Sequence, residues 1–268
     1  MEMEINLEKL CGDVRDIVAK TAGFIRDELD KRVELNIEIK GRHNYVTHVD
    51  KGAEEMLVKV LAGLIPESGF IAEEGTSTKR GKKYNWIIDP LDGTTNFIHG
   101  LPPYAISVGL LADDEIILGV IYEVALRECF YAWKGSSAYL NGKVIHVSKV
   151  DKVNDSLVAT GFPYTDFSHL SHFMETVRFF MENSHGLRRL GSAATDIAYV
   201  ACGRFEAFYE YGLSPWDVAA GILIVKQAGG RVSDFKGGKD YLFGGEIVIS
   251  NELIFDEFLE DVKTIMIP

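Results

Sequence analysis

The sequence predicts an α+β fold built from mixed layers of helices and sheets. Two observations predict it. Apolar residues recur every three or four positions near both ends of the chain, as they do on amphipathic helices. Residues 84–134 instead hold short apolar runs separated by turns, as in an antiparallel sheet. Because such helices and sheets are each apolar on one side, we expect them to stack on one another.

The first half of the chain begins with two predicted helices. Apolar positions between Leu7 and Val33 follow helical spacing, and a second apolar stripe follows Asp50 and ends near Pro66. Three apolar runs then predict strands at residues 106–111, 116–122 and 128–133. The dipeptide Asn141-Gly142 predicts a hairpin turn, because both residues tolerate positive φ.

After residue 150 the pattern alternates between strands and helices. The predicted strands cover residues 156–160, 205–210, 231–234 and 246–250. The predicted helices are 170–182, one starting at Ser192, 215–227, and an amphipathic helix at the C-terminal end. On this change of pattern we divide the chain into an N-terminal α+β part, residues 1–150, and a C-terminal α/β part, residues 151–268. We expect the second part to complete a functional site that begins in the first.

The composition is that of an ordinary globular protein and argues against several classes. The chain has 268 residues, of which 47% are hydrophobic, and a net charge of −12. Nucleic acids and anionic membranes need a basic face, so we expect neither as the main partner. Neither a long apolar stretch nor a signal-like start is present, and we expect a cytoplasmic location. The three cysteines are interpreted as buried small hydrophobes.

The most informative motif joins an apolar strand to two acids. The run Trp86-Ile87-Ile88 leads directly into Asp89 and Asp92, while Pro90 and Gly93 favour a bend. Carboxylates placed after a buried strand are costly to desolvate unless they are paired or bind a metal. An ordinary turn is the alternative interpretation. We also expect an Asp or Thr side chain to cap a helical turn here, so that its N–H groups point towards the same place.

Three further acids stand where they could complete a cation site. Glu73 follows an apolar run, although a solvated loop would look the same. Asp217 falls in the first turn of an apolar helix, where favourable interaction with the helix dipole is the alternative. Asp50 precedes the second predicted helix and is a candidate N-cap. An all-oxygen ligand set favours Mg²⁺ or Mn²⁺ over zinc. The sequence lacks the central motifs of serine hydrolases, P-loop NTPases and dinucleotide-binding folds.

Together these motifs resemble the inositol monophosphatase family of magnesium-dependent, lithium-sensitive phosphatases. Four segments carry the resemblance, in the family's order and over nearly the whole chain: Glu73-Glu74, 89–97, Gly191-Ser192-Ala193-Ala194 and 216–221. The resemblance implies an alternating α/β layered sandwich of the sugar-phosphatase type and commonly a homodimer. It is specific because the segments occur together.

The resemblance also implies roles for individual residues. The ligands of two or three Mg²⁺ ions, or of Mn²⁺, would be Glu73, Asp89, the Leu91 carbonyl, Asp92 and Asp217. The catalytic residues would be Asp50, Glu73 and Thr94, with Thr94 oriented by Asp50 to help activate the attacking water. The substrate would be bound by Asp92, Gly93, Thr94, Thr95, Ala193, Glu210 and Asp217. Lys40 is a minor candidate, and Trp216 is interpreted as core or pocket wall.

We therefore expect an enzyme that hydrolyses inositol monophosphate, a small phosphorylated polyol, to inositol and phosphate. One alternative keeps the chemistry but changes the substrate to fructose 1,6-bisphosphate, histidinol phosphate or a 3′-phosphoadenosine nucleotide. A second alternative is an interaction protein with an incidental phosphatase site, since bacterial members of the family also associate with transcription machinery. The intact set of acids argues against interaction as the only role.

Overall fold

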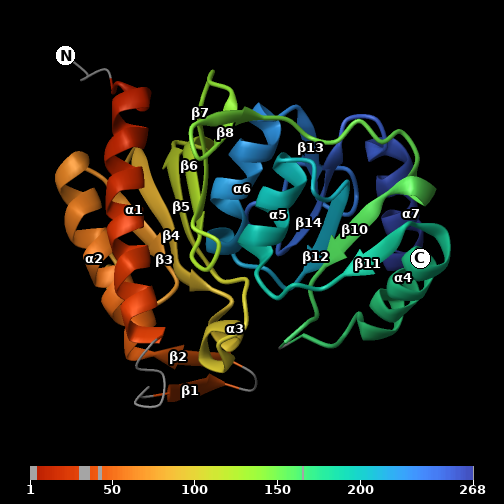
Figure 1. Cartoon of the computed structure of the whole chain (residues 1–268), viewed down its shortest axis with the longest axis horizontal. Coiled ribbons are helices and arrows are strands. Elements are labelled where there is room, and N and C mark those ends of the chain that lie inside the picture. The colour runs from red at the N-terminus through yellow and green to blue at the C-terminus, as the bar shows by residue number, and fades with distance from the viewer. Residues whose placement is uncertain (1–4, 30–36, 42–43, 165, 268) are drawn as a thin grey trace.

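The helices and strands stack in five alternating layers. The structure is a computed structural model that describes residues 5–29, 37–41, 44–164 and 166–267. Figure 1 shows the order of the layers: outer helices, a sheet, central helices, a second sheet and outer helices on the far side. The outer and central helices are α1 (Leu7–Leu29), α2 (His48–Leu64), α4 (Leu170–Asn183), α5 (Ala193–Ala201), α6 (Pro215–Gln227) and α7 (Phe255–Met266). The α+β prediction and the alternating layers are thereby confirmed.

The first sheet lies between the α1/α2 layer and the central helices. Within the described residues it has seven strands in spatial order of the chain: β3 (Gly69–Ala72), β4 (Tyr84–Asp92), β5 (Ala105–Ala112), β6 (Glu115–Glu123), β7 (Glu128–Trp133), β8 (Ala138–Leu140) and β9 (Lys143–Ile145). Its pairs are antiparallel, as predicted, except that β3 pairs parallel to β4. Asn141 and Gly142 have φ of 48° and 84° and join β8 to β9, which confirms the hairpin.

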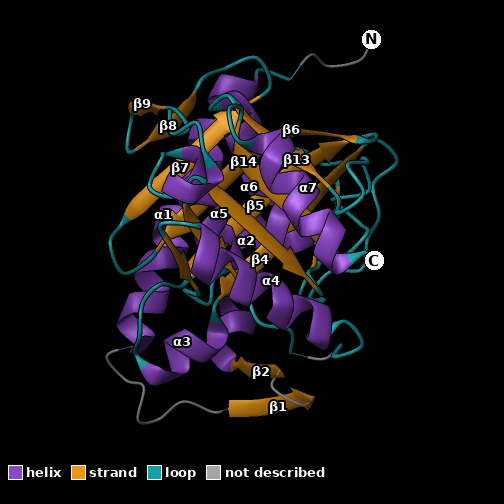
Figure 2. Cartoon of the chain, turned by 90° about the vertical axis from the view of Figure 1, so that its right-hand side faces the viewer, coloured by secondary structure: helices purple, strands orange, loops and turns teal. Residues whose placement is uncertain are grey.

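The second sheet lies between the central helices and the α4/α7 layer, which faces the viewer in Figure 2. In the described part of the chain its five strands are ordered β11 (Gly186–Arg188), β10 (Leu157–Thr160), β12 (Ala207–Tyr211), β14 (Glu246–Asn251) and β13 (Gly230–Ser233). The first three strands are parallel, whereas β14 runs antiparallel to both of its neighbours. The passage from residues 1–150 to residues 151–268 is a passage between sheets, and the division into two parts stays a prediction.

Several element boundaries differ from the predicted ones. The helix α2 begins at His48, so Asp50 lies inside its first turn and is not its N-cap. The strand β4 continues through Pro90 to Asp92, with a register shift after Asp89, so the two acids are still part of the strand. The predicted end of the first helix, at residues 30–33, lies outside the described residues. A short pair, β1 (Ile37–Gly41) and β2 (Asn44–Thr47), was not predicted.

The layers are held together by three apolar cores, one around the central helices and one under each outer helix layer. The central core joins α5 and α6 to inner residues of both sheets. Residues 218–225 of α6 are all buried, because this helix packs on both sides. Two outer cores join α1 and α2 to the first sheet, and α4 and α7 to the second. Within the described residues, we find no helix with both the length and the apolar character to cross a membrane.

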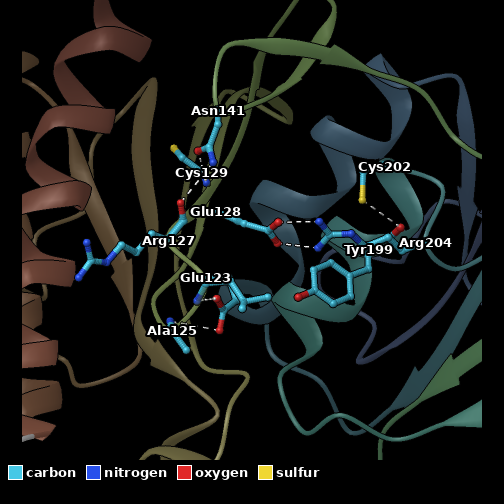
Figure 3. A network of polar contacts seen from close by, with 10 residues as sticks. Glu123, Ala125, Arg127, Glu128, Cys129, Asn141, Tyr199, Cys202 and Arg204 are labelled. Atoms are coloured by element: carbon cyan, nitrogen blue, oxygen red, sulfur yellow. Dashed lines mark hydrogen bonds and ion pairs between the residues drawn. The ribbon is translucent and has the colours of Figure 1, made fainter.

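A polar contact also connects the first sheet to the central helices. Figure 3 shows the guanidinium of Arg204, just after α5, facing the carboxylate of Glu128 on β7. Both hydrogen bonds of this bidentate pair measure 2.5 Å, and the guanidinium lies 4.5 Å from the centroid of the Tyr199 ring. The cysteines are all free; Cys11 and Cys129 are buried as predicted, whereas Cys202 is only half-buried.

Candidate active site

A cavity of about 270 Å³ opens where the ends of both sheets meet the starts of the central helices. Its walls come from the end of β3, the end of β4, the segments after β10 and β11, the end of β12 and the first turns of α5 and α6. Most of the predicted site residues line it: Glu73, Asp89, Leu91, Asp92, Gly93, Thr94, Thr95, Ala193, Glu210 and Asp217. The structure therefore brings together residues that are up to 144 positions apart, from Glu73 to Asp217.

Three aspartates form the centre of the acidic side of this cavity. One carboxylate oxygen from each of Asp89, Asp92 and Asp217 lies within 4.8 Å of the others. The backbone N–H of Leu91 donates to Asp89 over 2.9 Å, which folds that carboxylate back onto the end of β4. The N–H of Ser214 donates to Asp217 over 2.7 Å in a capping box at the start of α6. Asp217 thus caps its helix and also joins the cluster.

These acids change one another's protonation. Burial, and then the charge of Asp217, raises the pKa of Glu73 to about 8. Burial and the nearby Glu73 raise the pKa of Asp89 well above its usual value. Burial and the charge of Asp92 raise the pKa of Asp217 to about 7. Burial raises the pKa of Asp92 to about 6, although hydrogen bonds from neighbouring groups oppose the rise. A divalent cation is the natural counter-charge for such a cluster, and its all-oxygen donors fit Mg²⁺.

Glu73 reaches the cluster from a separate strand that a buried acid holds in place. Its N–H donates to the carbonyl of Ile88 over 3.2 Å, because β3 lies parallel to β4. The carboxylate of Glu54, on α2 and fully buried, accepts hydrogen bonds from the N–H of Glu74 at 2.8 Å and from the N–H and hydroxyl of Thr76 at 2.7 Å. Sequence reasoning missed Glu54. The available signal was a charged residue beside the apolar stripe of α2.

Thr94 stands at the edge of the cluster, in contact with Asp50. Its hydroxyl lies 2.9 Å from a carboxylate oxygen of Asp50 and 2.9 Å from the carbonyl of Leu91. Asp50 is buried behind Thr94 and does not line the cavity, and the Thr94 hydroxyl connects it to the cavity. The predicted pair is therefore in contact, while Lys40, the minor candidate, has a side chain outside the described residues.

The turn between the acids and α3 (Thr94–His99) needs a glycine. Gly93 has φ of 89° and is the N-terminal flank of α3, which has no side-chain cap; the expected cap by Asp or Thr is therefore wrong. A Cβ on Gly93 would lie 3.1 Å from the carbonyl oxygens of both Gly191 and Pro103. The left-handed backbone and this close approach together explain the glycine. Asn96 then ties α3 to the neighbouring loops, since its amide donates to two carbonyls at 2.8 Å.

The start of α5 connects the acidic side of the cavity to the opposite wall. The hydroxyl of Ser192 and the N–H of Ala194 both donate to one oxygen of Asp92 over 2.7 Å. Ala193 is thereby placed on the cavity wall beside Asp92. Glu210, at the end of β12, lines the same wall; burial and the charges of Asp217 and Asp92 raise its pKa well above the usual value.

Two further residues of this wall were missed by sequence reasoning. Among the described lining residues, Arg189 is the only basic one. Its guanidinium lies 5.2 Å and 5.5 Å from the ring centroids of Phe162 and Tyr164, and it donates a hydrogen bond to the Tyr164 hydroxyl. Asp196 is fully buried, and neither of its carboxylate oxygens has a hydrogen-bond partner within the described residues. Trp216, for which core was the favoured interpretation, lines the cavity and also packs against the central core.

The layered fold and the carboxylate-lined cavity define a class of protein whose site could hold a metal ion. The model of the inositol monophosphatase family matches residues 10–266, and the chain belongs to that family. Inositol-1-monophosphatase of Mesorhizobium japonicum is 41% identical over 230 residues, covering 85% of this chain and 86% of that protein. Nus factor SuhB of Pseudomonas aeruginosa is 38% identical over 251 residues, covering 91% and 93%. The crystal structure of extragenic suppressor protein suhB from Bartonella henselae superposes with a TM-score of 0.91 at 35% identity, covering 95% of this chain and 98% of that one.

Proposed function

We propose that the protein is a Mg²⁺-dependent phosphomonoesterase that hydrolyses inositol monophosphate to inositol and phosphate. One observation carries the proposal: the cluster of Asp89, Asp92 and Asp217 and the buried carboxyl of Glu210 line one cavity. The first group suits a cation that binds phosphate, and the second suits the hydroxyl groups of a polyol. The relative named inositol-1-monophosphatase supports the same substrate.

The proposed metal ligands divide into two overlapping sets. Glu73, Asp89 and the Leu91 carbonyl would hold one Mg²⁺, while Asp89, Asp92 and Asp217 would hold a second. A third, weaker ion would share Glu73. Bound Mg²⁺ neutralises the phosphate oxygens and lowers the pKa of water, which is the chemistry that the cluster alone lacks. Mn²⁺ has the same preference for oxygen and is expected to substitute.

The remaining residues would bind the phosphate, orient the attacking water and accept its proton. The N–H groups of Gly93, Thr94 and Thr95 would bind phosphate oxygens at the cavity floor. The Thr94 hydroxyl donates to Asp50, which leaves its oxygen free to accept a hydrogen bond from the attacking water and to orient that water for in-line attack on phosphorus. The water's proton would move towards Thr94 and Asp50 as the new P–O bond forms, while the bond between phosphorus and the polyol oxygen breaks on the opposite side and that oxygen takes a proton from solvent.

The alcohol would be held by the other wall. Glu210 would accept hydrogen bonds from ring hydroxyls, and the N–H of Ala193 would donate one. Asp92, already held by Ser192 and Ala194 at 2.7 Å each, would accept another. Asp217 would contact the substrate on the phosphate side. These contacts favour a small polyol phosphate over an apolar ester.

A substrate panel tests the proposal. Phosphate release is measured from inositol 1-phosphate, fructose 1,6-bisphosphate, histidinol phosphate and 3′-phosphoadenosine 5′-phosphate, with Mg²⁺ and with excess EDTA. We expect the highest kcat/KM for inositol 1-phosphate and no turnover in EDTA. Asp89→Asn should abolish turnover, whereas Asp114→Asn, on an exposed turn, should not. Turnover that persists in EDTA would reject the metal-dependent mechanism, and a large preference for another ester would replace the substrate.

Homodimerisation, inhibition by Li⁺ and a cytoplasmic location are parts of the same proposal, because the chain belongs to a family for which they are expected. Light scattering after size exclusion measures the mass in solution, and a mass of one chain would reject the dimer. Titration of LiCl into the Mg²⁺-dependent assay tests inhibition. Cell fractionation tests the location.

The name Nus factor SuhB, carried by a relative at 38% identity, favours a second candidate. The chain would then act as a Nus factor by associating with transcription machinery. A pull-down of RNA polymerase that survives Asp92→Asn, together with no phosphatase activity in the wild type, would favour this role over the enzyme. A wild type with phosphatase activity and no polymerase in the pull-down would support the phosphatase role only.

A further inference from the structure

We infer that Gly161 determines substrate specificity, because the Glu210 carboxyl occupies the space that a side chain at position 161 would fill. Gly161 follows β10 directly, and Glu210 lies on the neighbouring strand β12. This inference rests on the proposed function, in which Glu210 binds the hydroxyl groups of the leaving alcohol. It assigns the choice of a polyol to a residue that itself has no functional group.

The geometry at Gly161 leaves no alternative space for a Cβ. A Cβ built on its backbone would lie 1.9 Å from Oε1 of Glu210, 2.0 Å from Cδ and 2.2 Å from Oε2. All three distances are far below van der Waals contact, so the carboxyl and a Cβ cannot coexist there. Any residue other than glycine would therefore have to displace the carboxyl of Glu210.

The two strands cannot separate easily to relieve such a clash. β10 and β12 are paired in parallel, with Thr160 opposite Tyr209. The Thr160 hydroxyl also donates to the Tyr209 carbonyl over 2.7 Å, one residue before the pair in question. Because the backbones are fixed, the flexible Glu210 side chain is the part that moves. We expect Gly161→Ala to fold and to redirect one carboxyl.

The backbone conformation of Gly161 is not what requires a glycine. Gly93 and Gly191, on the same cavity, have φ of 89° and 93°, where other residues are strained. Gly161 does not have a positive φ, so an alanine fits its backbone. The missing side chain alone is therefore the feature that matters, and alanine is a clean probe of it.

The surrounding charges restrict where the displaced carboxyl can go. Burial, and then the charges of Asp217 and Asp92, raises the pKa of Glu210, while the Arg189 guanidinium lowers it, so a displaced carboxyl would be repelled by the two acids and attracted by Arg189. Displacement of the Glu210 carboxyl by a Cβ at position 161 would change the distance between that carboxyl and the leaving alcohol. The proposed metal ligands and Thr94 come from the first sheet, α3 and α6, and would keep their positions.

The test compares two esters that differ only in the alcohol. Inositol 1-phosphate needs the alcohol wall, whereas p-nitrophenyl phosphate has no hydroxyl groups for Glu210 to bind. We expect Gly161→Ala to lower kcat/KM for inositol 1-phosphate about tenfold or more, mainly through KM, and to change that for p-nitrophenyl phosphate less than about twofold. Gly12→Ala is the matched control, because no atom lies within 4 Å of a Cβ at that position in α1; it should change neither.

A double-mutant cycle assigns the effect to Glu210. In a Glu210→Ala background the clash is gone, so Gly161→Ala should cost no further activity on inositol 1-phosphate. Equal losses on both esters, additive losses in the cycle, or unchanged kinetics in Gly161→Ala would each overturn the inference. If Gly161→Ala does not fold, the double variant must fold, because it removes the clashing carboxyl; failure of both variants would also overturn it.

Failure of the proposed function would give a different result. It would appear as a wild type without Mg²⁺-dependent turnover of either ester. The crystal structure of Gly161→Ala then decides the inference independently. A Glu210 carboxyl that keeps its wild-type position would refute it, and a displaced carboxyl on an unchanged β10–β12 pair would support it.

Discussion

Replacing Asp217 by asparagine should stabilise the metal-free protein at alkaline pH while it abolishes catalysis. Asp217 lies within 4.8 Å of Asp89 and Asp92, and burial and the charge of Asp92 raise its pKa to about 7. Asparagine has the same shape and no charge. Its amide oxygen can still accept the hydrogen bond that Ser214 now donates over 2.7 Å. The variant therefore removes repulsion and keeps the helix cap.

The size of the gain follows from the pKa. When the pKa of a carboxyl is higher in the folded state than in the unfolded state, the protein loses stability as the pH rises through the unfolded-state pKa. The loss is complete above the folded-state pKa. For Asp217 the rise from 3.8 to about 7 corresponds to about 4 kcal/mol. The carboxyl is half-buried beside a water-accessible cavity, so we expect screening to leave about 2 kcal/mol at pH 8. At pH 4, close to the unfolded value of 3.8, the gain should fall to about 0.5 kcal/mol.

Urea denaturation measures this difference. In EDTA at pH 8, Asp217→Asn should have a higher free energy of unfolding than the wild type, and at pH 4 the two should nearly coincide. Saturating Mg²⁺ should reverse the order, since a ligand at about 100 times its Kd adds about 2.7 kcal/mol to the protein that binds it. Asp114→Asn, on an exposed turn, is the control. A variant less stable than the wild type in EDTA at pH 8, or a gain independent of pH, would refute the reasoning.

Three other predictions concern residues around the cluster. Glu54→Ala should weaken Mn²⁺ binding about tenfold, because it releases the loop that carries Glu73, and Glu54→Gln should lie between the two; Mn²⁺ titration by electron paramagnetic resonance measures this, and equal affinities would exclude a positioning role. Thr94→Val should lower kcat about 100-fold with little change in KM, while Thr94→Ser retains activity; a loss confined to KM would contradict the role. Glu128→Ala should lower the free energy of unfolding by about 1 kcal/mol and leave kcat/KM unchanged, and the same change in an Arg204→Ala background should cost almost nothing.

The elements with a strong local pattern were the predictable part of the fold. The apolar helix at residues 215–227 coincides with α6, and the Asn141-Gly142 turn lies between β8 and β9. Both patterns depend on neighbours in the sequence: helix spacing in one case and tolerance of positive φ in the other. The same holds for the two acids at the end of β4, because two carboxylates that follow a buried apolar run can be recognised from the local sequence alone.

The rest depended on contacts between distant segments. β3 and β11 have only four and three residues, and each exists because it pairs with a longer strand. Such short segments carry too little periodicity to be recognised alone. The Asp50 position was misread for a similar reason: the signal for an N-cap is a residue type, and two further residues before it also became helical. Glu54 binds main-chain groups 20 and 22 residues away, which residue spacing does not reveal.

The arrangement of the layers explains how the two halves of the cavity keep a fixed relation. Asp217 stands on α6, whose first turn is tied to β5 of the first sheet by the hydrogen bond from Ser107 to the Trp216 carbonyl at 3.0 Å. Asp92 ends β4 of the same sheet and accepts hydrogen bonds from Ser192 and Ala194 at the start of α5. The aspartate cluster is thus tied to both central helices. The same helices pack on the second sheet, which holds Glu210. The distance between the acidic cluster and the wall that carries Glu210 would then be set by packed layers, since loops alone would leave it variable.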